Sequence, residues 1–478
     1  MIYDVVIIGA GVVGGLTARE LSRFNLKVCV LESEADVSMG ASKANSAIVH
    51  GGYDPVPGTK KAKFNVQGAE MMEKVCADLD VGYIKNGSMV VAFDNEQLKH
   101  VQMLYERGIK NGVKGLSVIT GDEARKLEPA LSDKITGALL CNSSGIVCPY
   151  NLAIAAVGNA MDNGADLKLN FKVVNAKNNG DTYTITSEDG QNVESRYVIN
   201  CAGVNSDVIA SLFGDDGYHI KARKGEYMLL DKSEGHLVSR TIFQTPTKLG
   251  KGILVTPTVD GNLLVGPTSV PADKDDKTTT PEGLNQVKSI AALSCPSLNY
   301  RTVITSFAGE RSSCVESEDF IVEISPKSPR VIETVGIESP GLTSSPAIAV
   351  YIPELLKQAG LELTEKQDYN PIRVSPKHFR YAPDSEKNEM IKNDPRFGRI
   401  ICRCETVTEG EIVTAIHQNP KAMTFDAVKR RLRSGMGRCQ GGFCTPFITE
   451  IIARELGIDE TEVTKFGKGS NILVGKTK

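Results

Sequence analysis

Three glycines near the N-terminus, Gly9, Gly11 and Gly14, constrain the fold of this 478-residue chain more than any other feature. They follow directly after an apolar run, residues 3–8, interrupted only by Asp4, which has the length and character of a strand buried on both faces of a parallel sheet. An apolar stripe at helical spacing comes next, and a second predicted strand then ends at Glu32. This order of strand, glycine turn, helix, strand and acid predicts a βαβ unit that binds a dinucleotide.

Each position of this fingerprint has a physical role. Gly9 permits a tight turn, Gly11 lets the backbone approach a pyrophosphate at the helix N-terminus, and Gly14 lets the helix approach the strand closely. Glu32 is expected to accept hydrogen bonds from the ribose hydroxyls of an adenosine, and its charge disfavours a 2′-phosphate. The spacing alone does not distinguish NAD from FAD.

The overall charge excludes one large class of partner. The 55 Lys and Arg residues nearly balance the 58 Asp and Glu residues, so the net charge is −3, and the sequence pI is about 6.2. Such a chain has no global basic field to hold nucleic acid or an acidic membrane surface. With no Trp and 6% aromatic residues, it also lacks the stacking platforms that single strands need. We therefore expect no nucleic-acid partner.

The first residues and the apolar runs predict where the protein works. Residues 1–4 carry no basic segment of a secretory signal, and no run of eighteen apolar residues is visible in the chain. We therefore expect a cytoplasmic protein without a transmembrane segment, whose thiols are reduced.

The 11 cysteines are unevenly spread, since four of them crowd into the last eighty residues. These four form two close pairs, Cys402-x-Cys404 and Cys439-x4-Cys444. In a reducing compartment such a group predicts a metal or redox site rather than disulfides. Four thiolates suit zinc or a [2Fe–2S] cluster, but the one-residue and four-residue gaps are unusual for zinc. The other seven are expected mostly to be small buried apolar residues: Cys29, Cys76, Cys141, Cys148, Cys201, Cys295 and Cys314.

Four segments of the chain form a recognisable series of motifs. They are the glycine fingerprint, residues 41–52 (ASKANSAIVHGG), residues 200–203 (NCAG) and residues 336–346 (GIESPGLTSSP). In this order they resemble the motifs of the D-amino-acid-oxidase-like family of FAD oxidoreductases. Over about residues 1–360 the chain is most similar to that family's glycerol-3-phosphate dehydrogenase and L-2-hydroxyglutarate dehydrogenase branch. The resemblance implies FAD as the cofactor.

The cysteine pairs lie in a second recognisable setting. Residues 398–408 (GRIICRCETVT) and 437–444 (GRCQGGFC) surround them. These segments resemble the bacterioferritin-associated-ferredoxin type of [2Fe–2S] domain, over about residues 398–455. The resemblance implies a [2Fe–2S] cluster as the second cofactor, and it assigns the four ligands to Cys402, Cys404, Cys439 and Cys444.

Together these features predict an α/β fold of mixed α+β type. We expect a Rossmann-like FAD-binding domain and a small, mainly helical [2Fe–2S] domain. Residues 219–307 alternate β-rich runs with turns, such as residues 260–262 between the runs 253–255 and 263–265, and so predict an interleaved substrate domain on an antiparallel sheet. Thr408 followed by Glu411 predicts a capping box in the [2Fe–2S] domain. The expected ranges are 1–80, 145–215 and 335–362 for the FAD-binding domain, 81–144 and 216–334 for the substrate domain, 363–397 for a linker rich in Pro, Asn, Lys and Asp, and 398–467 for the cluster domain.

The family resemblance also implies which residues contact FAD. The stretch from Gly341 to Ser344 would present backbone N–H groups to the flavin at a helix start, where the helix dipole stabilises the negative charge of reduced flavin. The full set of expected contacts is Gly9, Gly11, Val13, Gly14, Glu32, Ser33, Ser42, Asn45, Ser46, Val173, Ala202, Gly203, Gly309, Gly341, Leu342, Thr343 and Ser344.

Oxidation of a secondary alcohol needs a base for the hydroxyl proton, and His50 is the leading candidate. It lies in the segment that resembles the flavin-contacting loop. The alternative is that this histidine only packs against the flavin ring or orients it.

An anionic substrate needs a fixed cation, and Arg311 lies where the family usually places its anion-binding arginine. The residue before it, Glu310, departs from the usual apolar residue and could partly neutralise the arginine or serve the site itself, which leaves the charge of the substrate open. Further candidates for substrate binding are Arg223, Lys224 and Tyr227, in a segment that resembles a substrate-domain strand of the branch. Because side chains alternate along a strand, only one of Arg223 and Lys224 can enter the site.

The resemblance therefore implies an FAD-dependent dehydrogenase of a small anionic 2-hydroxy compound. The first candidate substrate is sn-glycerol 3-phosphate, oxidised to dihydroxyacetone phosphate, with electrons leaving through the cluster to a protein or quinone-linked acceptor. Such a partner would allow peripheral membrane association. The alternatives are an L-2-hydroxyglutarate dehydrogenase, a subunit of an amino-acid or imino-acid dehydrogenase, and a non-catalytic electron-transfer subunit. No second nucleotide-binding motif is found, so we expect no resident NAD site.

Overall fold

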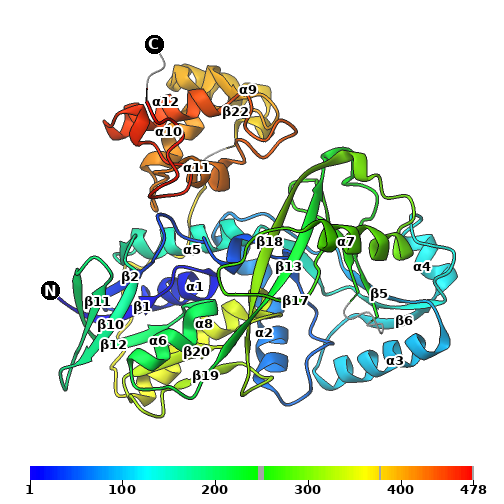
Figure 1. The fold of residues 1–478 in the computed structure, drawn as a ribbon, viewed down its shortest axis with the longest axis horizontal. Coiled ribbons are helices and arrows are strands. Elements are labelled where there is room, and N and C mark those ends of the chain that lie inside the picture. Colours follow the sequence, from blue (N-terminus) through cyan, green and yellow to red (C-terminus); the bar gives the residue numbers. More distant parts are fainter. Residues whose placement is uncertain (246–251, 376–377, 476–478) are drawn as a thin grey trace.

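Two large β-sheets and a small helical domain make up the computed structural model, which describes residues 1–245, 252–375 and 378–475. In Figure 1 the first sheet lies on the left, the second on the right, and the small domain above them. Among the described residues, no helix combines the length and the apolar character needed to cross a membrane.

The first sheet contains the predicted βαβ unit. Strand β1 (Ile2–Ile8) pairs in parallel with β2 (Val28–Leu31), and α1 (Val12–Leu21) connects them. Strand β12 (Asn192–Asn200) is the parallel neighbour of β1 on its other side. The remaining strands are β9 (Asp166–Lys168) beside β2, β10 (Val173–Asn178) and β11 (Tyr183–Ser187) in an antiparallel ribbon beside β12, β20 (Val331–Val335) parallel to β12, and β19 (Ile321–Ile324) antiparallel to β20.

Helices cover the first sheet and enclose a continuous apolar core. Helix α1 contacts α5 (Pro149–Asp162) and α8 (Gly341–Gln358), and α8 also contacts α2 (Lys60–Asp78). Close approach of α2 to α8 depends on Gly68, because a Cβ atom there would lie 2.0 Å from the carbonyl oxygen of Thr343. A short helix, α6 (Ser206–Leu212), follows β12.

The second sheet confirms the interleaved domain expected from the turn-rich segments. Its long strands β13 (Ile220–Leu230) and β18 (Val303–Cys314) pair in antiparallel fashion. The predicted turn at residues 260–262 joins two antiparallel neighbours, β15 and β16. The other strands are β5 (Ser88–Ala92), β6 (Leu116–Thr120), β7 (Gly137–Cys141), β14 (Thr241–Gln244), β15 (Leu254–Pro257), β16 (Leu263–Gly266) and β17 (Val270–Pro271), and all described pairs except β14 with β5 are antiparallel.

Helices and a small sheet complete this half of the molecule. The helices are α3 (Asn95–Lys110), α4 (Gly121–Leu127) and α7 (Pro281–Ser294), and the small sheet consists of β3 (Ile48–Val49), β4 (Tyr83–Ile84) and β8 (Gly145–Val147).

One predicted domain boundary is wrong. The strand pair β19 and β20 was expected in the substrate domain, within residues 216–334, but β20 pairs with β12 of the first sheet at Val198–Val331. Residues 321–335 therefore complete the FAD-domain sheet. The other predicted ranges stay a prediction.

The predicted linker, residues 363–397, is more structured than its composition indicates. It contains α9 (Asp384–Asn393) and the short 3-10 helix η6 (Pro395–Gly398), which contacts α9 and the next helix along the chain. Arg373 is buried, and its guanidinium lies 3.2 Å from Asp162 Oδ2 of α5. Contacts of this kind hold the segment against residues 1–362, which contain both large sheets and which we call the flavin half, so it is not a freely solvated tether.

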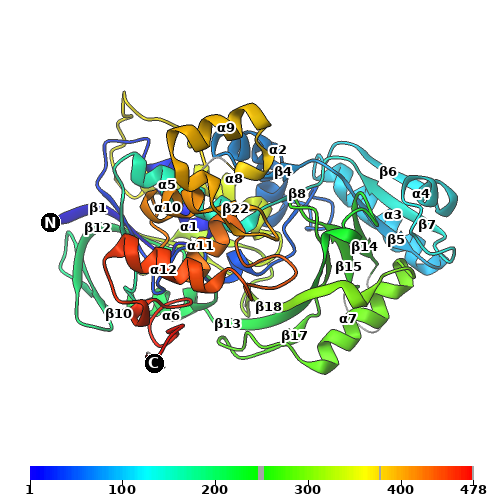
Figure 2. The same ribbon diagram turned by 90° about the horizontal axis from the view of Figure 1, so that it is seen from above.

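The C-terminal unit is mainly helical, as expected. It contains the strand pair β21 (Ile400–Cys402) and β22 (Val407–Thr408) and the helices α10 (Glu409–His417), α11 (Phe425–Leu432) and α12 (Thr445–Leu456), which enclose their own apolar core. The predicted capping box is confirmed, because Thr408 accepts from the Glu411 backbone N–H and Glu411 accepts from that of Thr408. Seen from above, this unit lies over α1 and α5 (Figure 2).

A buried carboxyl group in the first sheet makes stability depend on pH. Burial raises the pKa of Glu333, on β20, to about 8, although a hydrogen bond from Asn200 opposes the shift. Between the ordinary Glu pKa and this value the folded protein holds a proton that the unfolded chain releases. The free energy of unfolding should therefore fall as pH rises through this window, by up to about 1.4 kcal/mol per pH unit.

Replacing Glu333 with Gln should flatten this dependence, which denaturant unfolding at pH 5.5, 6.5 and 7.5 would measure. Glu323→Gln is the matched control, because Glu323 pairs opposite Glu333 but is half exposed beside Lys60. Parallel pH curves for the Glu333→Gln variant and the natural protein would contradict the assignment.

Candidate active site and cluster site

The glycine turn after β1 has the close contacts that its sequence predicts. Gly9 has φ 107°, and a Cβ atom there would lie 2.4 Å from the Cys201 carbonyl oxygen. A Cβ atom at Gly14 would lie 1.9 Å from the Gly9 oxygen. The hydroxyl of Ser42 accepts a hydrogen bond of 2.8 Å from the Val12 N–H at the start of α1. The turn, Ser42 and the end of β12 thus meet at a helix N-terminus, where a pyrophosphate fits.

Glu32 is fixed beside this turn. Its side chain is almost fully buried and accepts hydrogen bonds from the backbone N–H groups of Ala10 (2.8 Å) and Glu34 (3.0 Å) and from the Ser33 hydroxyl (3.1 Å). Burial raises the pKa of Glu32, while these donors act to lower it. The carboxyl group therefore occupies the position at the end of β2 that a ribose contact requires.

The N-terminus of α8 is tied to the loop that carries His50. The Thr343 hydroxyl accepts a 2.9 Å hydrogen bond from the His50 N–H and donates one of 3.2 Å to the Ile48 carbonyl. Beside it, the buried hydroxyl of Ser344 has no hydrogen-bond partner among the described residues. An unpartnered hydroxyl at the start of an 18-residue helix fits a polar cofactor edge, as predicted for the flavin.

The loop of residues 41–50 lies directly against strands β13 and β18. A Cβ atom at Gly309 would lie 1.8 Å from the Ala44 carbonyl oxygen, so only glycine fits there. The Tyr227 hydroxyl lies 3.1 Å from Ser46 Oγ, and its ring stacks on Phe307 with centroids 4.8 Å apart. The structure thus brings the predicted flavin-contacting loop and the predicted substrate strand together.

Two arginines on this part of the sheet share one serine. Arg223 and Arg311 lie opposite each other in the β13–β18 register. Arg223 Nε and Arg311 Nη1 each lie 3.2 Å from Ser269 Oγ, and Arg223 also donates to the Ser269 carbonyl at 2.9 Å. Among the described residues neither guanidinium forms an ion pair with a carboxylate. Two neighbouring cations without a counter-charge are suited to bind an anion such as phosphate.

Lys224 and Glu310 point away from this pair, because side chains alternate along a strand. The Lys224 ammonium is nearly fully buried and lies 2.6 Å from Asp276 Oδ2. Its predicted place in the substrate site is therefore not supported, because Lys224 is committed to the other face. Burial raises the pKa of Glu310, and among the described residues it forms no ion pair with Arg311. Glu310 thus does not neutralise the arginine.

His50 lies four residues after Ser46 on the same loop. Its carbonyl accepts a 2.7 Å hydrogen bond from Asn65 Nδ2, and its ring centroid lies 5.6 Å from that of Phe243 on β14. The backbone of His50 is therefore fixed from α2 and α8, while its ring faces the second sheet. Its role as the base stays a prediction.

The four C-terminal cysteines form two thiol pairs. Cys404 Sγ lies 3.6 Å from Cys439 Sγ, and the side chains of Cys402 and Cys444 form a hydrogen bond. That bond is the largest influence on Cys402 and lowers its pKa. In the described part of the chain, no group of three or more His, Cys, Asp or Glu surrounds a single metal position. Two pairs of thiolates are what the two irons of a [2Fe–2S] cluster use.

The backbone around these thiols fits a negatively charged cluster. Cys402 receives backbone N–H groups from Glu405 and Gly435, and Cys439 receives those of Gly441, Gly442 and Phe443. Hydrogen bonds to the sulfur atoms stabilise the negative charge of such clusters. The loop needs Gly437, because a Cβ atom there would lie 2.3 Å from Cys404 Cβ. The loop chemistry thus fits the implied cofactor.

Six of the seven remaining cysteines are buried, as expected, and Cys314 is partly exposed.

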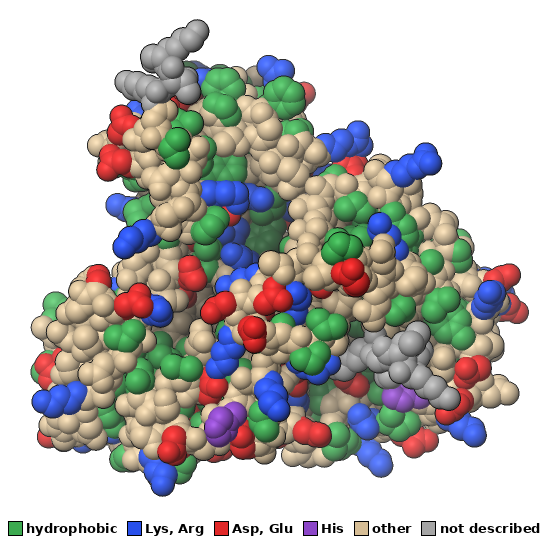
Figure 3. Space-filling view, in the orientation of Figure 1, with side chains coloured by type: hydrophobic (Ala, Val, Ile, Leu, Met, Phe, Trp, Pro, Cys, Tyr) green, Lys and Arg blue, Asp and Glu red, His purple; other side chains and the backbone are tan. Residues whose placement is uncertain are grey.

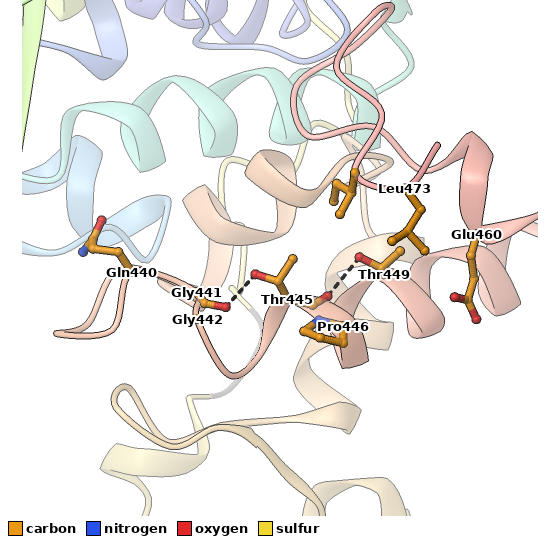
Figure 4. Close-up of a pocket in the computed structure, with 9 residues that line it drawn as sticks. Gln440, Gly441, Gly442, Thr445, Pro446, Thr449, Glu460 and Leu473 are labelled. Atoms are coloured by element: carbon orange, nitrogen blue, oxygen red, sulfur yellow. Dashed lines mark hydrogen bonds between the residues drawn. The ribbon is translucent and has the colours of Figure 1, made fainter. Parts of the chain in front are cut away.

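Two cavities lie near the cysteine loop. The first, of about 410 Å³, opens beside Gly441, Gly442 and Thr445, whose hydroxyl donates to the Gly441 carbonyl (Figure 4). The second, of about 390 Å³, lies between the cluster domain and the flavin half. Asn45 and Phe307 line it on one side and Met436 on the other.

The sequence did not reveal every residue at these sites. Ser269 and Phe243 carried no motif, because they reach Arg311 and His50 only through contacts between segments that are distant in the sequence.

Comparison with known families agrees with this division of the chain. Residues 4–355 match the family described as FAD dependent oxidoreductase. Residues 400–454 match the family described as BFD-like [2Fe-2S] binding domain.

Three relatives bear on the chemistry. A glycerol 3-phosphate dehydrogenase from Caloramator mitchellensis is 47% identical over 480 residues and covers 100% of this chain and 99% of that protein. The solved structure of dithionite-reduced L-alpha-glycerophosphate oxidase from Mycoplasma pneumoniae with FAD bound has a TM-score of 0.75 at 30% identity, covering 79% of this chain and 100% of that one. The mitochondrial L-2-hydroxyglutarate dehydrogenase of Homo sapiens is 32% identical over 288 residues, or 57% of this chain and 62% of that protein.

Proposed function

Because the chain belongs to the FAD-dependent oxidoreductase family, with FAD and a [2Fe–2S] cluster as its cofactors, we propose that it oxidises sn-glycerol 3-phosphate to dihydroxyacetone phosphate. The observation that carries this proposal is the pair Arg223 and Arg311, two guanidiniums that share Ser269. Support also comes from the full-length dehydrogenase relative and from the oxidase structure.

Each side chain has a role in this proposal. Arg311 and Arg223 bind the phosphate dianion and fix its orientation. His50 accepts the proton of the hydroxyl group that is oxidised. Tyr227 and Ser46 form the contact between the substrate strand and the flavin loop. Bound FAD supplies the hydride acceptor.

The electron balance requires a partner. Oxidation of the alcohol carbon releases two electrons and two protons, whereas a [2Fe–2S] cluster carries one electron at a time. We propose that the cluster passes both electrons in turn to a one-electron carrier, a protein subunit that is either free in the cytoplasm or linked to membrane quinones.

The test is an anaerobic absorbance titration of the holoenzyme, with its iron and sulfide assayed. Glycerol 3-phosphate should bleach the flavin band and then reduce the cluster, whereas L-2-hydroxyglutarate, proline and glycine should not. If one of these three compounds bleached the flavin and glycerol 3-phosphate did not, that compound would be identified as the substrate. No bleaching by any of them, combined with reduction by dithionite, would favour the non-catalytic electron-transfer alternative.

L-2-hydroxyglutarate is the second candidate substrate. The human relative acts on it by name, and the two arginines could each bind one of its two carboxylates. A phosphate dianion would bind both guanidiniums with a single group. The ratio of the kcat/KM values for glycerol 3-phosphate and L-2-hydroxyglutarate therefore separates the two candidates.

Adjacent residues on β13 give a matched test of the anion site. Arg223→Gln should raise the KM for glycerol 3-phosphate about tenfold to a hundredfold, because a charge-assisted hydrogen bond contributes roughly 1.5–3 kcal/mol and each 1.4 kcal/mol is about a factor of ten. Lys224→Gln should change that KM less than about twofold, since Lys224 pairs with Asp276 on the other face. Steady-state rates with an artificial acceptor measure both. Equal effects of the two substitutions would place the anion elsewhere.

A further inference from the structure

We propose that the cluster domain works from one fixed position, set by three groups of ion pairs between this domain and the flavin half, and that Arg433 is the main positioning residue. We call these groups the docking contacts. They are Asp36 with Arg430 and Arg431, Asp260 and Asn262 with Arg433, and Asp231 and Lys232 with Arg438 and Glu405. The inference rests on the proposed function for the direction of electron flow.

The first docking contact is fully buried. Asp36 follows β2 in the flavin half, and both its oxygens face Arg431 at 2.9 Å, while Arg430 Nη2 lies 2.5 Å from Oδ2. Burial alone would raise the pKa of Asp36, but the two guanidiniums hold it below its ordinary value. A buried, bidentate contact of this kind fixes both the distance and the orientation between the two segments that it joins. It joins α11 of the cluster domain to the loop that follows the dinucleotide strand.

The second docking contact centres on Arg433. Its guanidinium lies 2.7 Å from Asp260 Oδ2 and 2.9 Å from Asn262 Oδ1, both in the turn between β15 and β16. Its Nε also lies 3.2 Å from Oε2 of Glu405, a buried carboxylate that contacts Lys232 of the flavin half at 3.0 Å as well. Arg433 thus joins the substrate sheet to a carboxylate within the cluster domain.

Arg433 also acts directly on the cysteine loop. It ends α11 in the left-handed conformation, with φ 66°, and turns the chain toward Gly435, whose N–H reaches Cys402. Glu405 directly follows Cys404, and Arg438 directly precedes Cys439. Every docking contact except that of Asp36 therefore lies within two residues of a cluster ligand or of its N–H donor.

The third docking contact connects to the substrate strand. Arg438 binds Asp231 through two hydrogen bonds of 2.9 Å, and Asp231 directly follows β13. The same strand carries Tyr227, which contacts Ser46 of the flavin loop. Four residues of extended strand span about 13 Å, so one rigid element links the flavin loop to the neighbourhood of Cys439.

The surface view agrees with a cluster domain that is held against the flavin half. Figure 3 shows Lys and Arg side chains where the upper lobe meets the body, around a hollow. The cavity of about 390 Å³ lies at this junction and is lined by Arg430 and Arg433 together with Asp260. A domain that swung between two positions would have to break the hydrogen bonds of Asp36 with Arg430 and Arg431 at each excursion.

The experiment separates two half-reactions in the anaerobic holoenzyme. Stopped-flow absorbance follows flavin reduction by glycerol 3-phosphate, and freeze-quench EPR follows cluster reduction. Arg433→Gln should slow cluster reduction at least tenfold, while flavin reduction stays within twofold. Arg438→Asp should slow cluster reduction less than Arg433→Gln does. Adding Asp231→Arg to Arg438→Asp should restore the rate of cluster reduction to within threefold of the natural protein. Lys114→Glu, in an exposed ion pair far from the junction, is the matched control and should change neither rate.

Two results would overturn the proposal. The first is cluster reduction at the natural rate in the Arg433→Gln variant; the second is an equal loss in both half-reactions. If glycerol 3-phosphate fails to reduce the flavin, small-angle X-ray scattering provides a readout that needs no substrate. The natural protein should then fit one fixed arrangement, whereas Arg433→Gln should give a larger maximum dimension. A natural protein that already scatters as a mixture of arrangements contradicts a fixed position.

Discussion

Replacing Arg311 with methionine is expected to lower kcat/KM for glycerol 3-phosphate by about a hundredfold to a thousandfold. Removing one partner of a buried, hydrogen-bonded charge pair costs roughly 2–5 kcal/mol, and each 1.4 kcal/mol is about a factor of ten. Methionine keeps the length and apolar stem of the side chain on β18, so the strand should persist. The flavin absorbance of the Arg311→Met variant should equal that of the natural protein. This measurement separates loss of substrate binding from loss of cofactor.

Arg311→Lys is the matched control for this prediction. It retains the charge but not the planar pair of donors, so an intermediate loss is expected. Steady-state rates over a range of substrate concentrations give kcat and KM for each variant. If Arg311→Met keeps kcat/KM within threefold of the natural protein, the anion is bound elsewhere and the role of the Arg223–Arg311 pair is refuted.

Replacing Cys404 with serine should remove the cluster and stop electron delivery to one-electron acceptors. The thiolate is the ligand, and a serine hydroxyl does not ionise at neutral pH, so one iron loses a ligand. The rate of acceptor reduction should fall at least about a hundredfold, whereas flavin bleaching by substrate should stay within about twofold. Cys404 is exposed, so the substitution places little strain on the fold.

The measurements are iron and sulfide content, EPR of the reduced protein, and the two half-reaction rates. Cys314→Ser is the control, because Cys314 is a partly exposed thiol outside both sites. Full acceptor reduction in cluster-free protein would show that electrons leave from the flavin directly, contrary to the proposed path.

Local patterns were enough for the parts of the fold that depend on neighbouring residues. The strand, turn and helix around Gly9, the turn at residues 260–262 and the Thr408 capping box all involve contacts within a few residues. The family motifs added the division into flavin and cluster units. These features could therefore be predicted without a structure.

Contacts between distant segments could not be predicted in this way. The pairing of β20 with β12 joins residues more than 130 positions apart, and nothing local distinguishes it from a place in the second sheet. Alternation showed that Arg223 and Lys224 face opposite ways, but only the register with Arg311 decided which of them faces the site. Asp36 carried no signal either, since its partners lie almost 400 residues further along the chain.

The late position of β20 in the sequence has a consequence for biosynthesis. The first sheet begins at residue 2 but lacks β20 until residue 335 has left the ribosome. At roughly 5–20 residues per second, synthesis of those residues takes about 20–70 s. From the time residue 200 is made until then, residues 198–200 of β12 lack the neighbour on that edge, and only afterwards does the contiguous cluster domain emerge. Flavin insertion should therefore precede iron–sulfur insertion during maturation, and the nascent chain should need protection from aggregation mainly before residue 335 is made.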